Sequence, residues 1–302
     1  MSKRTQMDTE IRFKIHDREE FAEGKQFGDI GPYERISGEV QFAVDPDTDA
    51  FSMVVDLQHA PRNGQGLVEF ATDFYILRPA DLERGNRRLL YDVNNRGAFR
   101  MLQFFNDAVH SNMPSTSEHA GNGFLMRRGY SLVWSGWQGD ILPGDGRMTM
   151  RLPTAKFDGE EITGITRSEF IVDEYGVLSM PLSANGFTSS HEAISTDTRD
   201  ATFTVREYES DQRQPIADNA WEFARLQNGR PIPSTTHCHL PGGFKPGWIY
   251  ELVYTAKNPK VQGLGLTGVR DLISFLLHED ADIDGTPNPL RQNGARMDKA
   301  YG

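Results

Sequence analysis

Cysteine is nearly absent from this sequence, which contains Cys238 and no other. A single cysteine excludes an internal disulfide and is typical of a protein from a reducing compartment. Long hydrophobic runs are also missing, since no window approaches the roughly 18 to 20 apolar residues that a membrane helix needs. The first residues, Met1 to Glu10, are polar and lack the apolar stretch of a secretory signal. We therefore expect a cytoplasmic protein with no membrane partner.

The sequence contains fewer positively charged than negatively charged residues. The chain of 302 residues has 32 Lys and Arg against 43 Asp and Glu, which gives a formal net charge of -11. Because a phosphate backbone is bound through a cationic surface, this balance argues against nucleic acid as a partner. Aromatic residues at 10% and charged residues at 25% are ordinary for a globular protein. The length allows one large domain or two modest ones and leaves the oligomeric state open.

Several catalytic and cofactor-binding motifs are missing from the sequence. No G-x-S-x-G nucleophile turn is present, because Ser131 has Gly129 two residues before it but Val133 two residues after it. A P-loop, a G-x-G-x-x-G turn, an H-E-x-x-H helix and paired C-x-x-C motifs are absent as well. We therefore predict no cofactor, and the residues alone complete no catalytic constellation.

What the chain does contain is period-two alternation, followed by a strand–helix–strand pattern. Alternating apolar residues predict strands over Phe51–Leu57 and Val68–Ile76, each with one face in water. Leu89–Val93 and Tyr130–Trp134 are short apolar runs typical of buried strands. Between them, apolar residues recur at helical spacing over Phe99–Val109. This unit is typical of a parallel sheet.

The predicted organisation has three parts. Residues 1–140 hold the N-terminal strands and the first half of the sheet, residues 141–248 form a β-rich insertion or lid, and residues 249–302 return to the core. A helix is predicted over Leu266–Glu279, with Thr267 as its cap and Asp271 in its first turn. The predicted fold class is α/β, with a mostly parallel sheet, antiparallel N-terminal strands and a β-rich insertion.

Several stretches of the chain resemble one known family. They are Gly31 to Glu34 with Ile36 to Gly38, Asp56 to Asn63, Asn94 to Gly97, Gly129 to Asp140, and Tyr250 to Tyr254 with Gly263 to Asp271. Together they are similar to the uncharacterised bacterial "alpha/beta hydrolase domain" family, over about Gly31 to Pro289. The resemblance implies a partial α/β-hydrolase-like fold and a serine-type, esterase-like hydrolase. Its partner would be a small-molecule substrate with an ester or related acyl bond.

The resemblance also implies where the catalytic residues lie. In that family a stretch like Asn288-Pro289-Leu290 is followed by a strand and then by a G-x-S-x-S-G-R nucleophile turn. This sequence ends at Gly302, so the nucleophile, the triad acid and the histidine are expected beyond it, and residues 1–302 alone are predicted to be inactive. The alternative is a complete, non-catalytic protein whose β-rich segment binds a carbohydrate or another small ligand.

The first candidate loop holds Asn95, Arg96 and Gly97. By the resemblance, this loop supplies an N–H of an oxyanion hole, where a glycine lets the backbone approach the substrate oxygen. The alternative is a plain strand-to-helix loop in which Asn94 or Asn95 caps the helix.

A second candidate group follows the next predicted strand. Open α/β sheets bind ligands outside the carboxyl ends of their strands, which places Trp137, Gln138 and Asp140 at the mouth of a substrate pocket. The alternative is a pair of core tryptophans and a Gly-Asp turn. Trp134 ends the apolar strand and is assigned to the core.

The third group is His237-Cys238-His239. Two histidines at positions i and i+2 of a strand share a face, and zinc accepts such ligands, so a metallohydrolase is a further alternative. No companion motif supplies another ligand, and we predict a partly buried pair and no metal.

Overall fold

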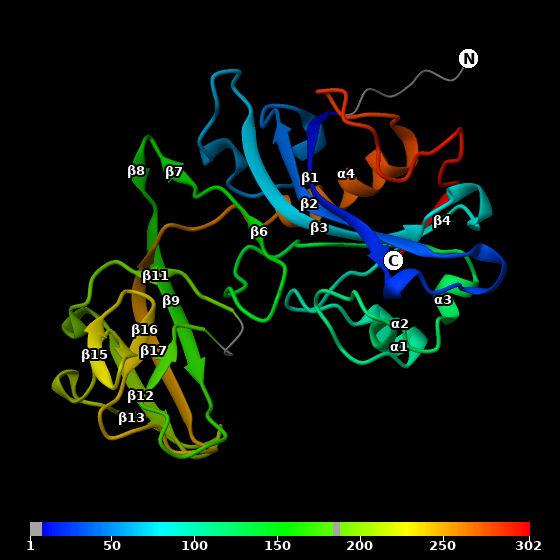
Figure 1. The fold of residues 1–302 in the computed structure, drawn as a ribbon. Coiled ribbons are helices and arrows are strands. Elements are labelled where there is room, and N and C mark those ends of the chain that lie inside the picture. Colours follow the sequence, from blue (N-terminus) through cyan, green and yellow to red (C-terminus); the bar gives the residue numbers. More distant parts are fainter. Residues whose placement is uncertain (1–7, 184–187) are drawn as a thin grey trace. The chain divides into compact units, whose positions relative to one another are not determined.

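The protein consists of two compact units in a computed structural model that describes residues 8–183 and 188–302 (Figure 1). The first unit spans Met1–Pro153 and Val261–Gly302, and the second spans Thr154–Lys260. The sequence placed the corresponding divisions at residues 141 and 249. Each unit has a hydrophobic core of its own.

The first unit is built around a sheet with the strand order β1-β2-β3-β5-β4-β18, and β6 pairs with β3. The strands are β1 (Thr9–Phe21), β2 (Tyr33–Val44), β3 (Val68–Pro79), β4 (Arg88–Tyr91), β5 (Ser131–Ser135), β6 (Met150–Arg151) and β18 (Lys299–Tyr301). The α-helices are α1 (Met101–Asn106), α2 (Ser117–Ala120), α3 (Phe124–Arg127) and α4 (Leu264–His278). Short 3-10 helices cover Ala22–Gly24, Gly28–Ile30, Asp49–Phe51, Leu57–His59 and Leu82–Arg84.

The predicted fold class, a mostly parallel α/β sheet like that of the α/β-hydrolases, is wrong. Strands make up 37% and helices 17% of the structure, and several of its sheets are antiparallel. Among the described residues the parallel pairings are β4 with β5 and β18 with β4, while β1, β2, β3, β5 and β6 pair antiparallel. The helical spacing over residues 99–109 yields only the short α1. Local periodicity does not report the direction of the partner strand.

The strand predicted over Val68–Ile76 is confirmed as part of β3. Val68, Phe70, Phe74 and Ile76 are buried in the core. Phe70 stacks on Phe42 of β2 with ring centroids 4.8 Å apart. The antiparallel pairing of β2 with β3 therefore buries one continuous apolar face.

The strand predicted over Phe51–Leu57 is wrong, because this stretch forms 3-10 turns. Phe51, Val54 and Leu57 are buried, at a spacing of three residues that suits a 3-10 turn. Met53 and Val55 are 91% and 76% exposed, although the alternating pattern placed both on the apolar face. Every second residue here is apolar, but every third residue is buried.

Helix α4 lies close to its predicted position but begins differently. Its first helical residue is Leu264, and Gly263 occupies the cap position, so Thr267 lies within the helix and is not its cap. Asp271 lies in the middle of α4, where its carboxylate accepts a hydrogen bond of 2.5 Å from the Thr9 hydroxyl. The buried stripe includes Phe275, whose ring stacks on Phe13 of β1 with centroids 4.9 Å apart. Helix α4 therefore covers the apolar face of the sheet.

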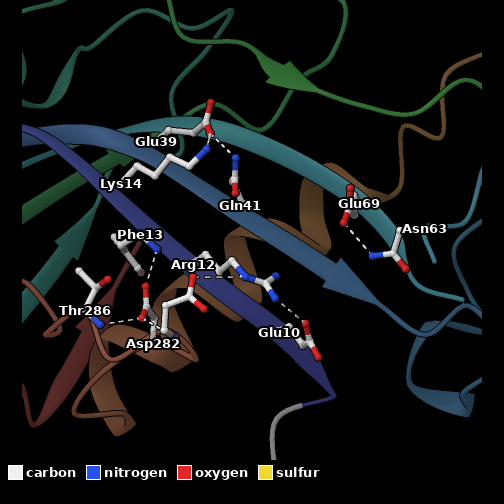
Figure 2. A network of polar contacts seen from close by, with 11 residues as sticks. Glu10, Arg12, Phe13, Lys14, Glu39, Gln41, Asn63, Glu69, Asp282 and Thr286 are labelled. Carbon is white, nitrogen blue, oxygen red and sulfur yellow. Dashed lines mark hydrogen bonds and ion pairs between the residues drawn. The ribbon is translucent and has the colours of Figure 1, made fainter. Parts of the chain in front are cut away.

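A loop that follows α4 covers the outer edge of β1. The Asp282 carboxylate accepts a hydrogen bond of 2.7 Å from the Phe13 N–H, as Figure 2 shows. The same side chain accepts the Thr286 N–H at 2.8 Å, and the Ile283 N–H donates to the Ile11 carbonyl. An uncovered strand edge invites association with another chain, and these bonds satisfy part of this one.

The second unit consists of short antiparallel strands around an aromatic core. The strands are β7 (Lys156–Phe157), β8 (Glu160–Glu161), β9 (Thr163–Phe170), β10 (Ser179–Pro181), β11 (Glu192–Ala193), β12 (Thr202–Arg206), β13 (Gln214–Pro215), β14 (Ala224–Gln227), β15 (Arg230–Pro233), β16 (His237–His239) and β17 (Ile249–Lys257). Thr198–Asp200 and Asp218–Ala220 are 3-10 helices. In the largest sheet, β17 pairs with β9 along one side and with β12 and β11 along the other side. Strand β13 pairs with β12. Strand β17 therefore completes this unit.

Candidate functional site

Two loops of the first unit emerge at the same edge of its sheet. Strands β4 and β5 run parallel and are paired directly, so the loop after Tyr91 and the loop after Ser135 leave their carboxyl ends side by side. Strand β18 pairs parallel with the other side of β4. A Cβ placed on Gly302 lies 3.8 Å from the Tyr91 carbonyl oxygen and from Val93. The carboxyl end of β18 therefore reaches the same edge.

Hydrogen bonds tie the two loops together. The buried Asn94 side chain donates to the Ser135 carbonyl at 2.7 Å. The Trp137 indole N–H donates to the Asn94 carbonyl at 2.7 Å. The Arg96 N–H donates to the Gln138 side-chain oxygen at 3.0 Å. The structure thus brings together the two candidate groups, 95–97 and 137–140, that the sequence proposed separately.

Asp92 organises the first loop, and sequence analysis missed it. One of its carboxylate oxygens accepts the Trp134 indole N–H at 2.7 Å and the main-chain N–H groups of Arg100 and Met101, both at 3.1 Å. The last two bonds satisfy donors at the start of α1, so Asp92, and neither Asn94 nor Asn95, serves that helix. Trp134 itself is buried in the core. The feature of the sequence that could have identified Asp92 is an acidic residue between a predicted strand and a predicted helix.

Gly97 is the tightest point of the site. Arg96 and Gly97 adopt left-handed backbone conformations with φ of 56° and 71°. A Cβ on Gly97 would lie 2.3 Å from the Met148 carbonyl oxygen, so glycine is required here. The Gly97 carbonyl accepts the Met148 N–H at 3.0 Å. Within the described residues, the N–H of this buried glycine has no hydrogen-bond acceptor.

Trp137, Gln138 and Asp140 follow β5 and are partly exposed. The Gln138 main-chain carbonyl accepts the Met150 N–H at 2.9 Å, which anchors this loop to β6. Asp140 lies 3.9 Å from the Arg96 guanidinium. A Cβ on Gly265 of α4 would lie 1.9 Å from the Trp137 carbonyl oxygen, so the helix approaches this loop as closely as a glycine permits.

Two hydroxyl groups at this edge are engaged in hydrogen bonds within the protein, those of Ser135 and of Thr149, which donates to the Gln138 carbonyl at 3.2 Å. Ser135 is buried, and its hydroxyl shares a hydrogen bond of 2.8 Å with Tyr91. Burial raises the pKa of the Tyr91 phenol. Partial burial and the charges of Arg100 and Arg147 lower the pKa of His110.

The histidine pair of the second unit lies on β16. The His239 ring nitrogen Nδ1 contacts the Leu178 carbonyl at 2.8 Å, and that of His237 contacts the Thr236 hydroxyl at 3.0 Å. Burial raises the pKa of the Cys238 thiol between them. Among the residues placed by the structure, no group of His, Cys, Asp and Glu is arranged to hold a metal ion.

Several aromatic residues of the second unit, which as a group motivated the carbohydrate-binding alternative, are packed in its core, whereas Phe157, Tyr175 and Tyr208 are exposed. Phe170, Phe203, Trp221, Phe244 and Tyr250 are buried and contact one another edge to face or tilted. A ring that is packed on other rings offers no face for a sugar. The buried aromatic residues therefore give that alternative no support, and the alternative itself stays a prediction.

Comparisons with models of protein families, with curated proteins and with solved structures find no match to this chain. In the described ranges, 8–183 and 188–302, no helix has the length and apolar character needed to cross a bilayer. The function is therefore inferred from the geometry of the two loops and from the residue pattern.

Proposed function

We propose that the loops 94–97 and 135–140 form the oxyanion-binding and substrate-binding half of a serine-type hydrolase that acts on an ester or related acyl bond. The observation that carries this proposal is the buried Gly97 N–H without an acceptor, at the carboxyl end of a strand in a parallel pair. A buried donor costs free energy unless it is paired, and a substrate oxygen that gains negative charge is a suitable partner. The stretches that carry the family resemblance include both loops.

In the proposed reaction, a serine hydroxyl attacks the acyl carbon and its proton passes to a base. The carbonyl oxygen becomes an oxyanion, which the Gly97 N–H stabilises. Trp137 supplies an apolar wall beside it, and Gln138 holds the loop through the Arg96 N–H. We propose that the serine lies on a segment that follows Gly302, because the carboxyl end of β18 points to the edge that holds Gly97.

The test compares Asn94→Ala with the unchanged protein, both produced from the whole reading frame that contains these residues, using p-nitrophenyl acetate. Asn94 acts as a positioning residue, so its loss shifts the Gly97 N–H and lowers kcat by about a hundredfold, with little change in KM. Asn63→Ala, in an exposed turn, is the matched control and keeps the original kcat. A folded Asn94→Ala protein with unchanged kcat would contradict the proposal. So would rapid hydrolysis by residues 1–302 alone.

A further inference from the structure

Charged residues gather on one face of the main sheet of the second unit. Side chains alternate along β17, so Tyr250 and Leu252 enter the aromatic core and Glu251 lies on the opposite face. Around Glu251 lie Arg167 of β9, Arg206 of β12 and Arg213, the residue before β13. We call these three arginines and Glu251 the arginine cluster.

The contacts within the arginine cluster are close. Arg213 donates to both Glu251 carboxylate oxygens, at 2.5 Å and 3.0 Å. Arg167 donates at 2.9 Å, and Arg206 lies 3.5 Å from the carboxylate. The Glu251 side chain is only 3% exposed because the guanidinium groups cover it. One arginine fork is enough to pair a carboxylate, so the other two cations exceed what Glu251 requires.

Neighbouring carboxylates do not remove the excess of positive charge. Glu169 lies opposite Glu251 in the strand register, and its charge acts on Arg213. With both glutamates counted, the cluster still holds more cations than anions. Like charges held this close repel one another, and a further anion beside them would offset the remaining excess.

The cluster also retains unused hydrogen-bond donors. Arg206 is 8% exposed, and its buried Nε has no partner within the described residues. Arg167 and Arg213 are 57% and 50% exposed, so their guanidinium groups remain open to solvent. A buried guanidinium donor without an acceptor is unfavourable, and an added oxyanion would supply acceptors.

We propose that the arginine cluster is a binding site for an oxyanion, the phosphate or carboxylate group of a small molecule, held by the exposed guanidinium groups of Arg167 and Arg213. Planar guanidinium forks match the geometry of both groups, which is why arginine is preferred where such groups are bound. This site is in the second unit and does not depend on the proposed hydrolase activity.

The test follows the arginine Nε–H NMR signals of the protein during separate titrations with inorganic phosphate and with acetate. We expect saturable shifts of the Arg167, Arg206 and Arg213 signals with at least one of these anions. Tighter binding of phosphate identifies a phosphate ligand, and tighter binding of acetate identifies a carboxylate. The absence of saturable shifts with both anions overturns the proposal.

Two variants separate the site from general charge effects. Arg167→Gln removes an exposed member of the cluster and is expected to weaken anion binding about tenfold or more, since a hydrogen bond to a charged group is lost. Arg199→Gln removes an exposed arginine that is paired with Asp197, and it is expected to leave the affinity unchanged. Equal weakening by both variants overturns the proposal, because it indicates nonspecific screening. Thermal unfolding of each variant confirms that the affinities refer to folded protein.

Discussion

The side-chain amide of Asn94 donates a hydrogen bond of 2.7 Å to the main-chain carbonyl of Ser135. Asn94 follows β4 and Ser135 ends β5, so this buried bond joins two parallel strands just beyond their paired residues. The Asn94 carbonyl in turn accepts the Trp137 indole N–H. One asparagine thus uses its side chain and its main chain to fix both loops of the candidate site.

The first prediction concerns the stability that this asparagine provides. Asn94→Ala removes the close donor of the buried Ser135 carbonyl, which retains a longer contact of 3.5 Å from the Tyr91 hydroxyl, and we expect the free energy of unfolding to fall by about 1 to 3 kcal/mol. The matched control is Asn95→Ala, at an exposed neighbouring position, which changes it by less than about 0.5 kcal/mol. Urea unfolding measures both, and equal stability of the two variants contradicts the role of Asn94.

The second prediction concerns the backbone at Gly97. Gly97→Ala forces a side chain into a left-handed conformation and against the Met148 main chain, so we expect a loss of about 2 kcal/mol or more. Gly64→Ala is the control, because no atom lies within 4 Å of the added Cβ. Chemical denaturation of the two variants compares them directly. A Gly97→Ala protein as stable as the Gly64→Ala protein is inconsistent with the close approach.

The third prediction concerns the contact between α4 and the second loop. In Gly265→Ala the added methyl group overlaps the Trp137 carbonyl, so the loop must move and stability falls by about 1 to 3 kcal/mol. Leu266→Ala, the adjacent exposed position, is the control and changes stability little. Tryptophan fluorescence reports the displacement of Trp137. An unchanged emission spectrum together with unchanged stability shows that the contact is absent.

The fourth prediction concerns pH. The hydrogen bond from Arg213 is the main cause that lowers the pKa of Glu251 below its ordinary value of 4.5. The folded state therefore holds the proton less tightly than the unfolded state. The stabilisation of the folded state by ionised Glu251 is fully present above pH 4.5, and it is lost as the pH falls through the lowered pKa of Glu251.

We expect the melting temperature of the protein to fall in this acid range and to fall less in Glu251→Gln, which has no carboxylate to protonate. Glu174→Gln, at an exposed position, is the control and follows the original protein. Calorimetry across the acid range measures all three. Identical acid profiles of the protein and Glu251→Gln rule out a stabilising role for this carboxylate.

Part of the fold was predictable from the sequence, namely the strands whose faces differ clearly in polarity. The predicted strands at 68–76 and 130–134 fall within β3 and β5 or at their ends. Strand β1 was not predicted, because much of its second half, His16 to Glu20, is exposed and polar and therefore lacks apolar alternation. The direction of each pairing depends on partners distant in sequence, and that is why the fold class was wrong.

The candidate site was predictable only as separate pieces. The rule that ligands bind at the carboxyl ends of strands selected residues 95–97 and 137–140, and the structure places them on adjoining loops. Their role in binding remains a prediction. The roles of Asp92 and Asn94 could not be predicted, since their partners Trp134 and Ser135 are about forty residues away and no local pattern marks such a contact.

The most direct test of the proposed serine-type hydrolase is to read the coding DNA that follows the codon for Gly302. We predict an in-frame continuation that places a serine between glycines, in a strand-to-helix turn, within a few codons of β18. Such a serine would emerge at the edge that holds the Gly97 N–H. A stop codon directly after Gly302, or a continuation with no serine at such a turn, contradicts the proposal.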